Sequence, residues 1–184
     1  MKKSIFIIIV ILFFLSSKIL ADEVPIEVQI PLYFKIFSFD RNLKQRCPDT
    51  IKIGILYDPK KNESVKNKDE FIKVFNSLKD KTISGIPVQL TPISYGDSEL
   101  IKQVDIAYLS LSLSNKELTE LLNLLNNWNI PSLGLGGKSA ELGVVVSLSV
   151  FEGKPQIVIN LPAAKRLGID FSSRLLSLAK VINE

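Results

Sequence analysis

GVVVSLSVFEGKPQIVINLPAAKRLGIDFSSRLLSLAKVINE, the stretch Gly143–Glu184, carries the strongest structural pattern in the chain. Two apolar runs, Val144–Val150 and Gln156–Leu161, flank a short segment centred on Glu152-Gly153-Lys154. Glycine adopts positive φ without steric cost, so it suits the tight connection between two strands. The spacing therefore predicts a β-hairpin with a short loop.

The residues after this hairpin predict two helices. Asn160 precedes Pro162 as a side-chain cap precedes the first positions of a helix, and Gly168 ends the short helix that follows. Ser172 or Ser173 then caps a final helix. This helix is predicted to reach the end of the chain because apolar residues continue at helical spacing: Leu175, Leu176, Ala179 and Ile182.

The same stretch contains four short motifs in order: Gly153-Lys154-Pro155, Ile159-Asn160-Leu161, Ala163–Gly168 and Ser172–Ala179. This set resembles the C-terminal signature of the YfiR/HmsC-like periplasmic proteins, and weaker agreement extends back to Pro31–Ile36 and Asp40–Leu43. The resemblance implies an α/β sandwich, a periplasmic location and a homodimer. It also implies a regulatory role, because characterised relatives inhibit a membrane-bound diguanylate cyclase by contacting its periplasmic part. In those relatives, signalling then runs through cyclic di-GMP and affects biofilm formation.

Upstream of this stretch, predicted strands alternate with predicted helices. The strands lie near residues 51–57, 86–93, 105–111 and 131–135, and the helices near 65–80, 97–103 and 116–128. Asp97 and either Ser114 or Asn115 are candidate caps, and two prolines favour an edge position for the second strand. The alternation predicts a mainly parallel sheet with helices on both faces, made mixed by the antiparallel C-terminal hairpin. Residues 22–184 are therefore expected to form a single α/β domain, a three-layer α/β/α sandwich.

The amino-terminal residues show a secretory pattern. Lys2-Lys3 precede the apolar run Ile5–Leu15, and the small residue Ala21 precedes Asp22-Glu23. This order predicts a signal peptide at residues 1–21; the alternative is an uncleaved anchor, although the run is shorter than a span of ~20 residues. Cleavage removes three of the 23 basic residues and none of the 19 acidic ones, which leaves a net charge of about +1. No nucleic-acid partner is predicted at that charge.

Residues 24–40 predict a helix with a bend at Pro31, and this helix is apolar nearly all round. Such a helix is buried or covers a second hydrophobic surface. Core packing is the favoured interpretation. The alternative assigns Tyr33, Phe37 and Phe39 to a contact with a partner, which the resemblance implies is the periplasmic domain of a membrane protein.

The chain contains no histidine, which removes the commonest general base, the usual serine and cysteine triads and most zinc sites. Gly137-Lys138-Ser139 is similar to the end of a phosphate-binding loop, but Ser132 stands where that motif needs its first glycine. The single cysteine, Cys47, has no partner for an internal disulfide, which favours an inert or buried thiol. We therefore expect a non-enzymatic protein without a cofactor or a catalytic metal.

Polar residues follow several predicted strands, and they leave a second hypothesis open. Asp58 and Ser112 follow the first and third strands, while Gly136, Gly137 and Ser139 lie in the loop after the fourth. Open α/β sheets bind ligands at these strand ends, and the backbone N–H groups of the loop suit an anionic or polar ligand. Turns and helix caps are the simpler interpretation. The alternative function is a small-ligand-binding module that serves a receptor or a transporter.

Overall fold

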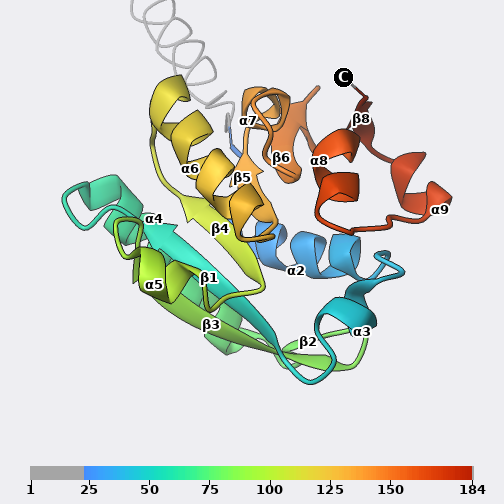
Figure 1. Ribbon diagram of the computed structural model, residues 1–184, viewed down its shortest axis with the longest axis horizontal. Helices are drawn as coiled ribbons and strands as arrows, with labels where there is room; N and C mark the ends of the chain where they lie inside the picture. Colours follow the sequence, from blue (N-terminus) through green and yellow to red (C-terminus); the bar gives the residue numbers. More distant parts are fainter. Residues whose placement is uncertain (1–22, 184) are drawn as a thin grey trace, which may run out of the picture.

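The computed structural model describes residues 23–183, so the predicted signal peptide lies outside the described residues. Within that range, the strands form one mixed sheet in the order β2-β3-β1-β4-β5-β6-β7-β8 (Figure 1). The strands are β1 Ile51–Tyr57, β2 Thr82–Ile83, β3 Ile86–Ser94, β4 Ile106–Ser110, β5 Ser132–Leu135, β6 Val146–Phe151, β7 Lys154–Asn160 and β8 Lys180–Ile182. The helices are α2 Ile26–Phe37, α3 Leu43–Arg46, α4 Asn62–Ser77, α5 Ser98–Ile101, α6 Asn115–Asn127, α7 Gly137–Glu141, α8 Leu161–Arg166 and α9 Ser173–Leu176.

Strand β4 shows how the sheet separates two hydrophobic layers. Ile106 and Tyr108 belong to a core shared with α2, α4, α8 and α9, whereas Ala107 and Leu109 belong to a core shared with α5 and α6. Successive side chains of a strand point to opposite faces, so a strand that is buried throughout needs helices on both sides. From β3 through β1, β4, β5 and β6 all neighbours are parallel. The predicted three-layer sandwich with a mainly parallel sheet is confirmed.

The predicted hairpin and its following caps are also present. Strands β6 and β7 pair antiparallel, and Glu152 and Gly153 make the connection with positive φ angles of 50° and 74°. Asn160 Oδ1 accepts a hydrogen bond from the N–H of Ala163 at 2.9 Å and so caps α8. Its amide also donates to the carbonyl of Ala140, which ties α8 to α7. Side-chain caps are likewise made by Asp97, Ser114 and Ser172.

The prediction of a long final helix was wrong. Helix α9 ends at Leu176, and Lys180–Ile182 form β8, which runs parallel to β7. Val181 and Ile182 are β-branched and fit the pleated surface of a strand. Pairing with Val158–Asn160 satisfies backbone groups that the β7 edge otherwise leaves open. This long-range pairing outweighs the local helical spacing, and it leaves Leu178 exposed between the two elements.

Helix α2 forms where it is predicted, with Pro25 at its N-cap and Pro31 inside it. The side chains of Tyr33 and Phe37 are 2% and 1% exposed, and they pack in the core. The alternative of a partner contact is therefore wrong for Tyr33 and Phe37, because a buried ring has no surface that a partner can reach. Phe39 is half-buried at the edge of the same core and keeps a face in solvent. No helix among residues 23–183 is both long and apolar enough to cross a membrane.

Cys47 lies at the end of α3 and is buried, as the sequence favoured. Burial raises the pKa of its thiol to about 11, and the nearby Asp105 and Asp40 carboxylates add to that rise. The thiol is therefore protonated and unreactive near neutral pH, because the thiolate is the nucleophilic form.

Candidate functional site

The order of the strands reverses between β1 and β4. Strand β3 lies on one side of β1, and β4 lies on the other. The chain continues from β1 into α4 and from β4 into α6. Open α/β sheets bind ligands in the crevice outside the carboxyl ends of the strands at such a reversal. A ligand site is therefore expected at Tyr57 and Ser110, where β1 and β4 end.

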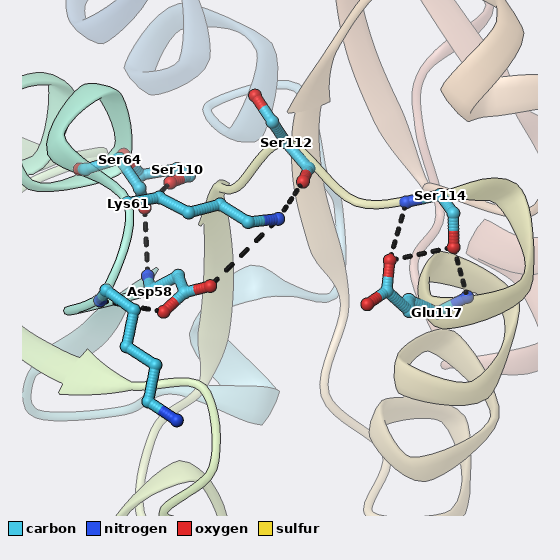
Figure 2. Close-up of polar contacts among 8 residues, drawn as sticks. Asp58, Lys61, Ser64, Ser110, Ser112, Ser114 and Glu117 are labelled. Carbon is cyan, nitrogen blue, oxygen red and sulfur yellow. Dashed lines mark hydrogen bonds and ion pairs between the residues drawn. The ribbon is translucent and has the colours of Figure 1, made fainter.

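Two buried serines join the ends of these strands (Figure 2). The hydroxyl of Ser64, in the first turn of α4, accepts the N–H of Asp58 at 2.9 Å and donates to the carbonyl of Ser110. The hydroxyl of Ser110 in turn donates to the carbonyl of Ser64 at 3.1 Å. We call this reciprocal pair the serine junction. It satisfies buried polar groups of β1, α4 and β4 at one point and makes the crevice rigid.

Asp58 and Lys61 bridge the two loops above the serine junction. The Asp58 carboxylate accepts the N–H of Lys60 at 2.9 Å and lies 4.0 Å from the ammonium of Lys61. That ammonium donates to the carbonyl of Ser112 at 2.6 Å, so the loop after β1 holds the loop after β4 (Figure 2). Asp58 therefore has the turn role that was its simpler interpretation.

Helix α6 starts beside this bridge with a capping box. Glu117 accepts hydrogen bonds from the backbone N–H of Ser114 at 2.8 Å and from its hydroxyl at 2.7 Å. The N–H of Glu117 donates back to Ser114 Oγ at 3.3 Å (Figure 2). The hydroxyl and the N–H of Ser114 lower the pKa of the Glu117 carboxyl, and the positive charge of Lys61 lowers it further.

We expect Ser114→Ala to raise the pKa of Glu117 towards its ordinary value, because the variant removes the hydroxyl that donates to the carboxylate. Titration of the Glu117 side-chain carbon by ¹³C NMR measures this directly. A group whose pKa is lowered by folding stabilises the fold above its unfolded pKa, and this contribution is lost as the pH falls through the folded value. An unchanged Glu117 titration in the variant contradicts the assignment.

A pocket of about 370 Å³ opens at the ends of β4 and β5. Its walls come from the first turns of α4 and α6, from α7 and from the loop that follows β4. The polar lining includes Glu63, Asn67, Ser112, Asn115, Lys138 and Ser139. The apolar lining includes Leu109, Leu111, Leu113, Leu118, Leu135 and Leu142, together with Tyr108. Ligand pockets in proteins have this mixture of an apolar surface with a few polar groups.

Buried hydroxyl groups fix the floor of this pocket to α2. Tyr108 donates to Gln29 Oε1 at 2.8 Å, and Gln29 donates to the carbonyl of Val24 at 2.6 Å. Tyr33 donates to the carbonyl of Gly134 at 2.6 Å. Burial raises the pKa of both tyrosines, so both phenols stay protonated donors near neutral pH. Helix α2 thus holds β4 and β5 through hydrogen bonds to Tyr108 and Gly134, two residues that line the pocket.

The residues predicted for a ligand are brought together only in part. Ser112 and Ser139 line one pocket, while Asp58, Gly136 and Gly137 are outside its lining. The N–H of Gly136 donates to the carbonyl of Leu148 at 2.8 Å, and the N–H of Ser139 donates to Gly136 at 3.2 Å. These two donors are engaged within the loop, which weakens the prediction that the loop receives an anion. Ligand binding at Asp58, Ser112 and Ser139 stays a prediction.

Several pocket residues were missed because they lie on helices. Glu63 and Asn67 are four residues apart on α4 and therefore share one face, as helical geometry requires. Lys138 belongs to α7, the short helix that follows the glycines. The sequence shows only that each of these residues lies within the first helical turns after a predicted strand, which is too little to assign it to a site. Which face of a helix turns towards the strand ends depends on packing against the sheet.

Comparison with known proteins identifies one family model. A model described as YfiR/HmsC-like matches residues 33–180. No curated protein matches the chain significantly.

Two solved structures show the same fold. A conserved domain protein from Vibrio cholerae superposes with a TM-score of 0.59 at 18% identity, over 86% of this chain and 60% of its own. An ABC domain from Streptococcus pneumoniae, solved in complex with L-Trp, gives a TM-score of 0.56 at 15% identity, over 80% of this chain and 62% of its own. The chain thus spans about three-fifths of the length of these neighbours. At such low identity the likeness concerns the fold alone.

Proposed function

This chain belongs to the YfiR/HmsC-like family, and from that premise we propose that it is an exported, non-enzymatic regulator of a membrane-bound diguanylate cyclase. In this proposal the folded domain acts in the periplasm, as a homodimer, by contacting the periplasmic part of the cyclase. The observation that carries the proposal is the family match, which covers all of the sheet except the last two residues of β8. The finer details follow from the resemblance of the C-terminal motifs to those of characterised relatives.

The hydrogen bonds of the serines near the reversal in strand order support a role without catalysis. The hydroxyls of Ser64 and Ser110 are consumed in the serine junction, and the hydroxyl of Ser139 lies 2.7 Å from the carbonyl of Gly136 and from Ser147 Oγ. A serine nucleophile needs an adjacent general base, and the chain has no histidine to serve as one. These serines instead hold elements together.

The proposal is tested in cells of the native host. Removing the protein is expected to raise cyclic di-GMP several-fold, and supplying the full chain is expected to restore the lower level. A version that lacks residues 1–21 stays in the cytosol and is expected to restore nothing, because it cannot reach a periplasmic domain. Unchanged cyclic di-GMP after removal overturns regulation. Equal rescue by the shortened version overturns export while leaving regulation in place.

The physical partner is tested by capture from detergent-solubilised native membranes. The tagged mature domain is expected to retain a membrane protein with a diguanylate cyclase domain, and light scattering is expected to give twice the monomer mass for the purified domain. Capture of no cyclase contradicts the proposed partner, and a monomer mass contradicts the homodimer.

The pocket favours a second candidate function, a small-ligand-binding module serving a receptor or transporter. The site lies where open α/β sheets bind ligands, and its volume falls in the range of ~300–1,000 Å³ that such sites occupy. The streptococcal neighbour was solved with a small molecule, L-Trp, bound. The two functions are compatible, since a ligand that binds one state of a regulator shifts its population.

A further inference from the structure

We propose that the pocket at the ends of β4 and β5 binds a small amphipathic amine, a compact apolar body that carries one protonated nitrogen. This inference rests on the second candidate function, ligand binding, and adds the chemical class of the ligand. Three features of the pocket carry it: its leucine wall, its surplus of carboxylates and the engaged state of its hydroxyls and loop amides.

The leucine wall accounts for the apolar body. Five leucines of the lining are neither buried nor fully exposed, and they come from four different segments: Leu111, Leu113, Leu118, Leu135 and Leu142. Half-exposed side chains gathered in a concave site lose further apolar surface to water when a ligand enters, which favours binding of an apolar body. Scattered surface leucines need no explanation, but leucines converging on one cavity indicate an apolar ligand.

The charges of the lining account for the nitrogen. Glu23 and Glu63 contribute two carboxylates, whereas Lys138 contributes the one ammonium among the lining residues. Glu63 is exposed in the first turn of α4 and forms no ion pair within residues 23–183. Asn67, one turn further along the helix, adds an amide that can accept a second hydrogen bond. An ammonium has only donors and so matches these acceptors.

The remaining polar groups of the pocket are unsuited to an anion. The serine junction uses both of its hydroxyls, and Gly136 and Ser139 use their N–H groups inside the loop. The Lys61 ammonium lies outside the lining, where the carbonyl of Ser112 and the Asp58 carboxylate hold it. The Lys138 ammonium is the one cation of the lining that an anion can meet. A carboxylate or phosphate placed here also meets the two like charges of Glu23 and Glu63, which costs affinity.

The test compares ligands that share a body and differ in the sign of the charged group. The pairs are 2-phenylethylamine with 3-phenylpropionate, and hexylamine with hexanoate, each added to the mature domain at neutral pH. An amine at about five times its dissociation constant is expected to raise the melting temperature by about 2–4 °C. The matched carboxylates are expected to leave it unchanged. Isothermal titration then measures the affinity of the amine that binds.

Two variants locate the binding, each with a control on the surface. Glu63→Gln removes the charge and keeps the shape, and it is expected to weaken amine binding about tenfold or more, as loss of a charge-assisted hydrogen bond does. Glu120→Gln, an exposed carboxyl of α6 outside the pocket, is expected to change nothing. Leu118→Ala is expected to weaken binding of both amines, whereas Leu124→Ala, exposed on the same helix, is not.

The outcomes distinguish two claims, that the domain binds a small ligand and that this ligand is an amine. Equal stabilisation by an amine and its carboxylate overturns the amine class and leaves a ligand-binding module. Selective binding that survives Glu63→Gln unchanged overturns the assignment to this pocket. A domain that responds to none of the four compounds overturns the proposed ligand class, and the cyclase proposal is then judged by its own cellular test.

Discussion

Asp40→Ala is expected to destabilise the fold by about 3–5 kcal/mol, because it leaves a largely buried guanidinium without its partner. The Asp40 side chain is fully buried and lies 2.7 Å from Arg46 Nη2, and the Arg46 side chain is only 19% exposed. Asp40 Oδ1 also accepts the backbone N–H groups of Asn42 and Asp170, each at 3.0 Å. One carboxylate thus joins the segment after α2, helix α3 and the segment after α8.

The neighbouring pair Arg41–Asp170 is the matched control. Its charges lie 2.9 Å apart, but the two side chains are 62% and 49% exposed. Arg41→Ala is expected to cost at most about 1 kcal/mol, because water and salt screen an exposed pair. Urea unfolding followed by the fluorescence of Trp128 gives both values. Equal costs for the two variants contradict the role assigned to Asp40.

Phe37→Ala is expected to destabilise the fold by about 3–5 kcal/mol, because it leaves a cavity in the main core. The Phe37 ring is 1% exposed and packs edge-on against Phe171, with 6.0 Å between the ring centroids. The same unfolding measurement tests it. A cost below about 1 kcal/mol contradicts the core role.

Phe39→Ala separates packing from partner contact. Phe39 is half-buried, and the Lys35 ammonium lies 5.1 Å from the centre of its ring, so its loss is expected to cost the fold clearly less than the loss of Phe37. We propose Phe39 as the remaining partner contact of the three aromatic residues. Capture of the cyclase is then expected to weaken in Phe39→Ala at a temperature where the variant is folded. Full capture by the folded variant contradicts that contact.

The caps illustrate why much of the fold is predictable. Residue type and spacing predict Asp97 and Asn160 as caps, and they leave Ser114 or Asn115 and Ser172 or Ser173 as candidates for two more. In the structure Asp97, Ser114, Asn160 and Ser172 each accept a backbone N–H from three residues ahead. A cap needs only a short polar side chain and the next turn of chain, so its signal is local. The hairpin is predictable for the same reason, since its loop and both strands are continuous in sequence.

Only those residues of the candidate site that directly follow a strand can be predicted from the sequence. Ser112 and Ser139 follow strands directly, and the chain order alone places them at the right edge of the sheet. Glu63, Asn67 and Lys138 face the pocket because α4 and α7 pack on the sheet at particular rotations. Phe71 and Phe75, on the same helix as Glu63 and Asn67, hold α4 in its rotation through contacts with a core built from residues distant in sequence.

The alternation of strands and helices, their caps and the hairpin are encoded locally, since each follows from contacts between residues close in the chain. Long-range packing instead makes Lys180–Ile182 a strand, chooses Tyr33 and Phe37 over Phe39 for full burial, and brings Glu63 and Lys138 to one pocket. Each of these depends on a partner more than twenty residues away. Burial and pairing at that distance are large enough to override a local helical spacing, and no local pattern records them.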